Sequence, residues 1–133
     1  MIRTPIQQIS KGDRSHYVRI ESSIASQIRT AKEASRAPWV AWVGEAMSRL
    51  RKESPIEIES LIMQAQFVAA SKKDKARLPF RMLNADFDEA RVMALKYNVD
   101  IQSVLVAALH LYSFVSSMAL PDEHDIENMK KTF

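Results

Sequence analysis

The sequence places an arginine between two apolar residues twice, at Arg19 in "HYVRIES" (16–22) and at Arg81 in "LPFRMLN" (78–84). Both stretches alternate apolar and polar residues, which is the period of a β-strand with one covered face. Each arginine would therefore point away from the core, and Tyr17 would share the outer face with Arg19. A guanidinium is a rigid fork of donors that binds carboxylates, phosphates and the acceptor edge of guanine with two hydrogen bonds.

The other residues capable of chemistry do not form a catalytic pattern. The acidic residues at 86–89 stand where a helix is expected to begin, and negative charge stabilises that end of a helix. There is no glycine-rich loop for phosphate and no cysteine for a thiolate metal site. The three histidines lie at unrelated spacings: His16, His110 and His124. We therefore expect no enzyme activity, metal, cofactor or small-molecule ligand.

Composition and charge indicate a globular, helix-rich chain with an anionic partner, built as one compact domain or as two very small lobes that share a core. Of 133 residues, 47% are hydrophobic and only two are glycine. Residues 1–53 hold ten Lys or Arg against five Asp or Glu, whereas residues 54–133 hold nine against eleven. The first part thus carries a net charge of +5 and the second −2, so a negatively charged partner should meet the first part.

The apolar run at 104–120 is expected to be a buried helix rather than a membrane span. It is shorter than the roughly 20 residues that a bilayer requires, and it contains His110, Tyr112 and three serines. No basic cluster flanks it. We expect no membrane partner, and the lack of cysteine is compatible with a cytoplasmic protein.

Helix and turn signals divide the chain into five segments. Ser22 or Ser23 can cap one helix, Pro38 suits the first turn of the next, and Ser54 with Glu57 forms a capping box for a third. The segments are a flexible basic arm (1–14), a strand with two helices (15–53), a linker helix and polar loop (54–76), a second strand with two helices (77–118) and a polar tail (119–133).

The second and fourth segments repeat each other at an offset of 62 residues. Sliding the chain by this offset superimposes "VRI" (18–20) on "FRM" (80–82), and Arg36 in the first turn on Asn98 in the second. The interval from strand to turn is therefore the same in both copies. The order strand, helix, helix is expected twice.

This pattern resembles the ribbon-helix-helix family of DNA-binding proteins, such as the Arc and MetJ repressors. In that family two strands pair into an antiparallel ribbon that enters the major groove, above a core of helices. Two copies in one chain resemble the tandem type found among TraY-like conjugative plasmid regulators. The implied fold is mainly α with a short two-stranded antiparallel ribbon, a tandem ribbon-helix-helix with an extra linker helix. Whether the strands pair within a chain or between chains is left open by the sequence.

The resemblance also implies residues that contact double-stranded DNA. Tyr17, Arg19 and Arg81 would read bases. The family holds phosphate with backbone amides at the start of the second helix, and basic residues flank each strand. The phosphate-binding candidates are Lys11, Arg14, Arg36, Trp39, Val40 and Arg77. Two departures weaken the phosphate sites, because Pro38 lacks an amide hydrogen and Asp100 puts a negative charge at the second site.

The expected role is regulation of plasmid conjugation genes, with assembly of a relaxosome at an origin of transfer as the alternative. Homo-oligomers on repeated DNA sites are a further expected partner. A pure protein-interaction module also has to be considered, because Trp39, Trp42 and the apolar segment 101–118 exceed what a small core needs. Antitoxins share the ribbon fold, but usually with a disordered toxin-binding tail, whereas the second half of this chain is expected to be folded. Packing in the core is the simpler explanation for the two tryptophans.

Overall fold

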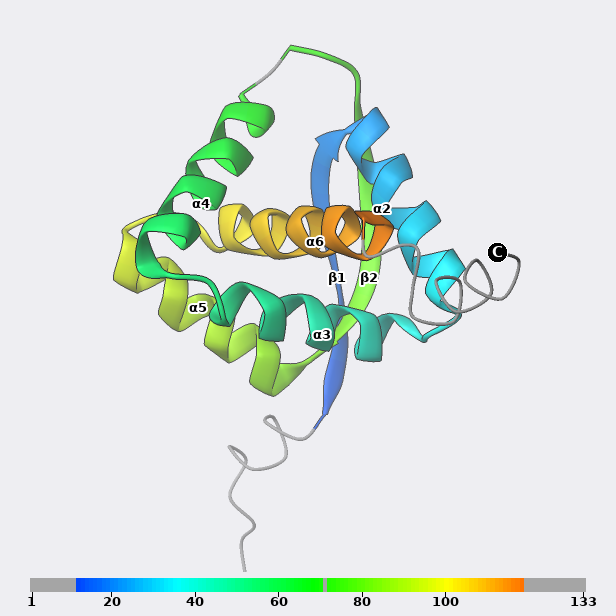
Figure 1. The fold of residues 1–133 in the computed structure, drawn as a ribbon, viewed down its shortest axis with the longest axis horizontal. Coiled ribbons are helices and arrows are strands. Elements are labelled where there is room, and N and C mark those ends of the chain that lie inside the picture. The colour runs from blue at the N-terminus through cyan, green and yellow to red at the C-terminus, as the bar shows by residue number, and fades with distance from the viewer. Residues whose placement is uncertain (1–11, 71, 119–133) are drawn as a thin grey trace, which may run out of the picture.

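The structure is a computed structural model, and it describes residues 12–70 and 72–118. This part of the chain is mainly helical and carries a two-stranded antiparallel sheet, as the sequence predicted (Figure 1). Its elements in chain order are β1 (Asp13–Glu21), α2 (Ser22–Ser35), α3 (Trp39–Arg51), α4 (Pro55–Ala69), β2 (Lys75–Leu83), α5 (Asn84–Tyr97) and α6 (Ile101–Met118).

The two strands form the ribbon within a single chain. Their register runs from Asp13 opposite Leu83 to Glu21 opposite Lys75, with Tyr17 opposite Pro79 at the centre. This answers the question of pairing that the sequence left open. Each strand begins earlier than expected, at residues 13 and 75, because pairing continues beyond the alternating core of each motif.

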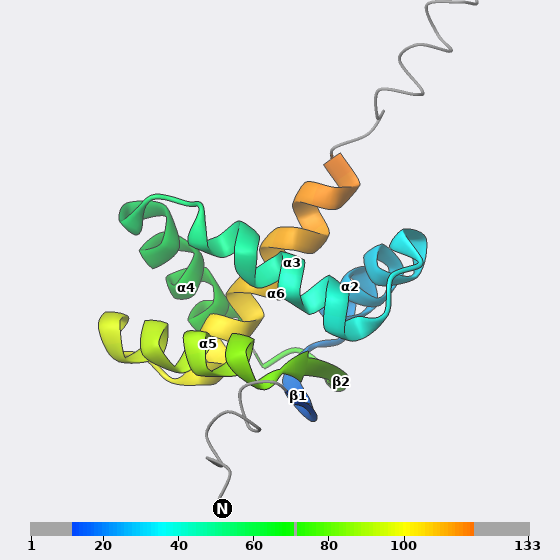
Figure 2. The ribbon, with the colours of Figure 1, turned by 90° about the horizontal axis from the view of Figure 1, so that it is seen from below.

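The ribbon has one buried face. The side chains that point to the helices are at most 3% exposed: Val18, Ile20, Leu78, Phe80 and Met82. These are the positions that alternation assigned to the core. Figure 2 shows the ribbon at one edge of the molecule, with α3 and α6 crossing above it.

Both helical hairpins turn at a residue with left-handed backbone conformation. Arg36 has φ 60° after α2, and Asn98 has φ 56° after α5. They are the only non-glycine residues with positive φ among those that the structure describes. This conformation is unfavourable for most residues other than glycine, including arginine, whereas asparagine tolerates it well. The two left-handed residues are 62 positions apart, although the turns differ in ψ, which is 8° at Arg36 and 50° at Asn98.

The predicted serine cap of α2 is wrong. The residue before the helix is Glu21, and no side chain caps this end. The backbone N–H of Ser22 instead donates to the Asp74 carbonyl at 2.9 Å, which joins the end of β1 to the segment before β2. In α4 the prediction is confirmed for the serine, since Ser54 Oγ accepts from the Glu57 N–H at 3.2 Å.

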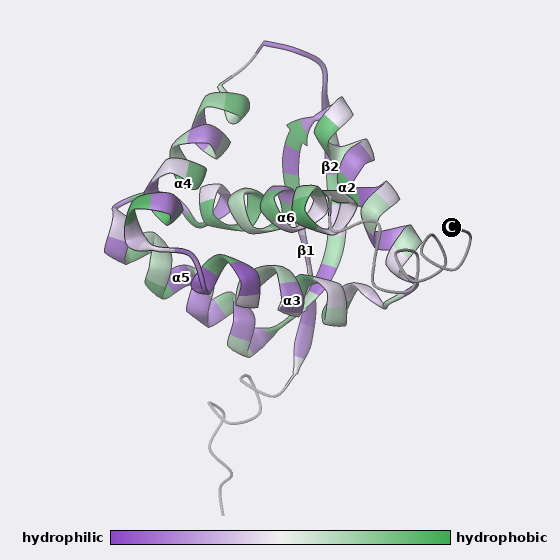
Figure 3. Ribbon diagram, viewed as in Figure 1, coloured by the Kyte–Doolittle hydropathy of each residue, from purple (hydrophilic) through white to green (hydrophobic). Residues whose placement is uncertain are grey.

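Helix α6 lies at the centre of the core. Residues Val104 to Leu109 are at most 4% exposed, so the buried helix that the sequence predicted is confirmed. Figure 3 shows that this helix is largely hydrophobic where it crosses between α4, α3 and α2. In the described ranges no single helix has the length and hydropathy to cross a membrane. Helices α5 and α6 meet these criteria only as a pair, and that pair is bent by 111°.

The two tryptophans belong to this core. Trp42 is only 1% exposed, and its ring packs edge-on against Tyr112 of α6 at a centroid distance of 4.9 Å. Trp39 is partly buried and lies 6.0 Å from Trp42. Core packing therefore accounts for Trp42, and it joins α3 to α6.

Candidate nucleic-acid interface

The central part of the ribbon's outer face carries three residues from each strand. Ser15, Tyr17 and Arg19 of β1 point outward, and they lie opposite Arg81, Pro79 and Arg77 of β2, respectively. All six are exposed. The structure thus brings together the three predicted base-reading residues, Tyr17, Arg19 and Arg81, on one surface.

Two uncompensated arginines face each other at one end of this surface. Arg19 is the cross-strand partner of Arg77, and among the described residues neither side chain has an anionic partner. The Arg77 guanidinium lies over the Tyr17 ring, 3.9 Å from its centroid. With Lys75 these residues line a cleft of about 400 Å³. Like charges directly opposite each other repel, so this end of the ribbon favours an anionic ligand.

Side-chain bonds to backbone carbonyl groups fix the strand and the loop around this cleft. Arg29 of α2 donates to the Arg77 carbonyl at 3.2 Å, which fixes the strand without occupying the Arg77 side chain. Lys75 directs its ammonium group to the Ala69 carbonyl at the end of α4. Glu21, the nearest acidic residue on β1, is mostly buried and lies 3.4 Å from Lys73. Arg19 and Arg77 are therefore the cations that remain free to bind.

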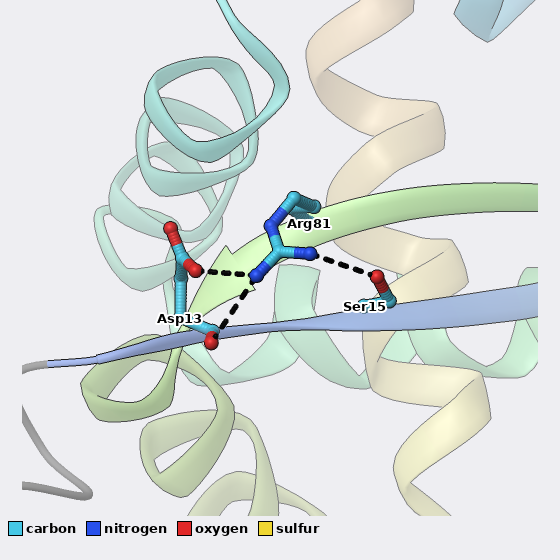
Figure 4. A network of polar contacts seen from close by, with 3 residues as sticks. All are labelled: Asp13, Ser15 and Arg81. Carbon is cyan, nitrogen blue, oxygen red and sulfur yellow. Dashed lines mark hydrogen bonds and ion pairs between the residues drawn. The ribbon is translucent and has the colours of Figure 1, made fainter.

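The other end of the ribbon is self-paired. Arg81 Nη2 donates to Asp13 Oδ1 at 2.6 Å, and Nη1 donates to Ser15 Oγ at 3.0 Å (Figure 4). A longer contact of 3.4 Å joins Nη2 to the Asp13 carbonyl. The guanidinium of Arg81 is thus partly satisfied before any ligand arrives.

The structure assigns different positions to the phosphate-binding candidates. Arg77 was predicted to flank the ribbon, but it lies on the ribbon beside Arg19. Arg14 is exposed on the opposite face of β1 from Arg19, at the ribbon end. Lys11 lies outside the described residues. The alternation of the second strand also extends back through residue 77, and that signal would have located Arg77.

The start of α3 has no side-chain cap, whereas Asp100 caps the start of α6. Trp39 and Val40 are in the first turn of α3, where backbone N–H groups lack helical partners. The Trp39 ring lies 6.3 Å from Phe80, so this helix end adjoins β2. At α6, Asp100 accepts from the Ser103 N–H at 2.9 Å and adds negative charge. The departure predicted at Asp100 is therefore present, and α3 offers the better phosphate site.

Arg36 remains available beside that site. It forms the turn between α2 and α3, is exposed, and uses its backbone N–H to donate to the Glu33 carbonyl at 3.1 Å. The following N–H, that of Ala37, donates to Ser35 Oγ at 3.2 Å. These bonds fix the turn in front of α3 and leave the Arg36 side chain free to meet a phosphate.

His16 lies beneath the ribbon in an apolar setting. Its ring stacks on Phe87 at a centroid distance of 4.4 Å, and its Nε2 is buried without a hydrogen-bond partner among the described residues. Burial lowers the pKa of His16 below its usual value of about 6.5, and the nearby positive charge of Arg14 lowers it further. At neutral pH the ring is uncharged and serves as part of the core.

The free energy of unfolding should therefore fall as pH falls below about 6.5. In that range the unfolded chain takes up a proton at residue 16 that the folded chain resists, so the unfolded state is favoured. We expect His16→Phe to reduce the loss of stability between pH 7 and pH 5, measured by urea denaturation at each pH. His110→Leu is the companion variant, because burial also lowers the pKa of His110. An unchanged pH dependence in both variants would contradict this account.

Comparisons of the chain with protein-family models, with curated proteins and with solved structures found no match. The function of the chain must therefore be inferred from the geometry of the ribbon.

Proposed function

We propose that this protein binds double-stranded DNA in a sequence-specific manner, with its β-ribbon in the major groove. The observation that carries the proposal is the exposed cross-strand pair of Arg19 and Arg77, which no anion among the described residues neutralises. A two-stranded ribbon fits the width of the major groove, and arginine is the side chain that most often reads guanine there. Tyr17, lying under Arg77, adds a surface for base or sugar contacts.

The fold proposed for this function is a tandem ribbon-helix-helix. Three features support it: the order strand, helix, helix at β1 and at β2; left-handed turns at Arg36 and Asn98; and the register of the ribbon. The register pairs Tyr17 with Pro79, which are 62 residues apart and thus equivalent in the repeat. A two-fold axis through this pair would exchange the copies, as it does in a dimer of two identical chains.

Phosphate contacts would hold the ribbon in the groove. We assign them to the amides of Trp39 and Val40, with Arg36, Arg14 and Lys11 as cationic contacts. The proposed role is a cytoplasmic, non-enzymatic regulator of plasmid conjugation genes in bacteria, with relaxosome assembly as the alternative. Several copies would cover repeated sites. These assignments depend on the family resemblance.

The test is selection of tight-binding sequences from a random duplex library by the full chain. We expect enrichment of a guanine-containing motif, and a slope of log affinity against log salt of about −4, for about four to five neutralised phosphates. Binding that depends on salt but shows no preferred sequence would contradict base reading. No binding to duplex DNA at low salt would contradict the whole proposal.

A protein-interaction role is the second candidate, because α4 exposes a row of apolar side chains. Ile56 and Phe67 are both 80% exposed, and Met63 lies between them on the same helical face. Such a row on the surface favours contact with another protein. Failure of the selection experiment, together with self-association in sedimentation equilibrium that is lost in Phe67→Ser, would favour this role.

A further inference from the structure

The two halves of the ribbon are equivalent in position but differ in charge: the Arg19 half is positive, whereas the Arg81 half is neutral. The offset of 62 residues relates Arg19 to Arg81, so both halves hold an arginine at the same place. The neighbours of these arginines differ: Arg77 corresponds to Ser15, and Lys75 corresponds to Asp13. One guanidinium thus has two basic neighbours, whereas the other has a hydroxyl group and a carboxylate.

The hydrogen bonds of Arg81 and Arg19 differ in the same way as their neighbours. Arg81 is engaged by Asp13 and Ser15 through bonds of 2.6 and 3.0 Å, whereas Arg19 has no polar partner among the residues described. In Figure 4 the Asp13 carboxylate and the Ser15 hydroxyl bind two different nitrogens of the Arg81 guanidinium. The pair remains accessible, since the side chain of Arg81 is 51% exposed and that of Asp13 is 37% exposed. Both groups can therefore reach a ligand that lies on the ribbon.

The carboxylate changes what Arg81 can contribute to DNA binding. The bidentate contact with guanine uses two guanidinium nitrogens, and Asp13 and Ser15 hold both terminal nitrogens of Arg81. In the pair, one hydrogen on each of these nitrogens is already committed. The Arg81 half is also electrically neutral, and its carboxylate would enter a groove lined by phosphates. In the Arg19 half the two guanidinium groups have no anionic partner among the described residues. The carboxylate of that half, Glu21, is mostly buried and lies 3.4 Å from Lys73.

We propose that Asp13 is a specificity-determining residue: it restrains Arg81, so the ribbon reads bases mainly from the Arg19–Arg77 end, and the preferred DNA site is not palindromic. This inference rests on the proposed DNA-binding function. In dimers of identical chains the symmetry of the protein imposes a palindromic site. A single chain that supplies both strands does not have that constraint. Asp13 makes the two halves different, because the equivalent position in the other half is Lys75.

The test compares the full chain with Asp13→Asn. First, selection from the random duplex library should give the parent a motif with strong preference in one half only. Asp13→Asn should then bind this duplex about three- to tenfold more tightly, since the exposed pair is weak and the freed arginine gains a base contact. Its own selected motif should acquire guanine preference in the second half.

Two controls separate this effect from a general change of charge. Glu59→Gln alters net charge by the same amount at an exposed position on α4, which is not part of the ribbon, and it should change affinity less than twofold. In an Arg81→Ala background, Asp13→Asn should give no gain. A gain that persists in that background would overturn the inference, because it would not pass through Arg81.

The failure of this inference can be distinguished from failure of the proposed function. If the parent selects a palindromic motif, or if Asp13→Asn binds the selected duplex more weakly, the role of Asp13 is overturned while DNA binding stands. Weaker binding would mean that Asp13 positions Arg81 for base reading. If the parent selects no sequence, the proposed function fails and this inference fails with it.

Discussion

Arg19→Ala is expected to lower affinity for the selected duplex about tenfold to a hundredfold, because a bidentate contact between arginine and guanine contributes about 1–3 kcal/mol of discrimination. Arg19 is exposed at the ribbon surface and has no competing partner among the described residues, so little of its binding energy is lost in breaking internal bonds. Fluorescence anisotropy with the selected duplex and with a scrambled duplex of equal length measures the effect. Affinity for the scrambled duplex should fall much less, since only phosphate attraction is reduced there.

The matched control for this prediction is Arg91→Ala. Arg91 is exposed on α5 and lies 3.4 Å from Asp88 of the same helix, away from the ribbon. Arg91→Ala removes the same charge as Arg19→Ala but no proposed base contact. We expect it to change the affinity for the selected duplex less than twofold. Arg81→Ala should fall between the two variants, because Asp13 already restrains that arginine. Equal losses for both duplexes in Arg19→Ala would show that Arg19 contacts phosphate rather than bases.

Local sequence patterns predicted the elements and the two faces of each strand. Alternation around Arg19 and Arg81 separated the buried side chains from the exposed ones, since successive side chains point to opposite sides of a strand. Proline and serine at 54–55 located the start of α4 because their effects act within one helical turn. Such signals arise between residues that are close in the chain, so they can be recognised in the sequence alone.

The pairing of the two strands could not be predicted in this way. A shift of the register by two residues would keep every side chain on its face while changing every cross-strand partner. The partners of Arg19 and Arg81 depend on the register that places Tyr17 opposite Pro79. The pairing of Arg19 with Arg77 and the place of Asp13 beside Arg81 were missed for this reason, whereas alternation alone could have assigned Arg77 to the outer face. Similarly, Ser22 was expected to cap α2, but a contact with Asp74, 52 residues away, determines its backbone bond.

The ribbon has no stability of its own, since two strands with one apolar face need a layer of helices beneath them. Trp42 links the helices of that layer, being 1% exposed and packed between Trp39 and Tyr112. Trp42→Ala should lower the free energy of unfolding by about 3–5 kcal/mol, the usual cost of removing a large buried aromatic side chain. Urea denaturation at pH 7 measures this change.

Trp42→Phe should cost much less than Trp42→Ala, although it removes part of the same ring system. The indole Nε1 of Trp42 is buried without a hydrogen-bond partner among the described residues, and leaving such a donor unpaired is itself unfavourable by about 1–3 kcal/mol. Phenylalanine keeps most of the apolar contact and eliminates that donor, so the two effects partly cancel. A loss of stability in Trp42→Phe as large as in Trp42→Ala would mean that the indole nitrogen has a hydrogen-bond partner in solution.

Because Trp42 supports the ribbon from inside, Trp42→Phe should keep the parent's affinity for the selected duplex, whereas Arg19→Ala should lose affinity while keeping the parent's stability. The opposite behaviour of these two variants is what separates a residue that holds the ribbon from one that reads DNA.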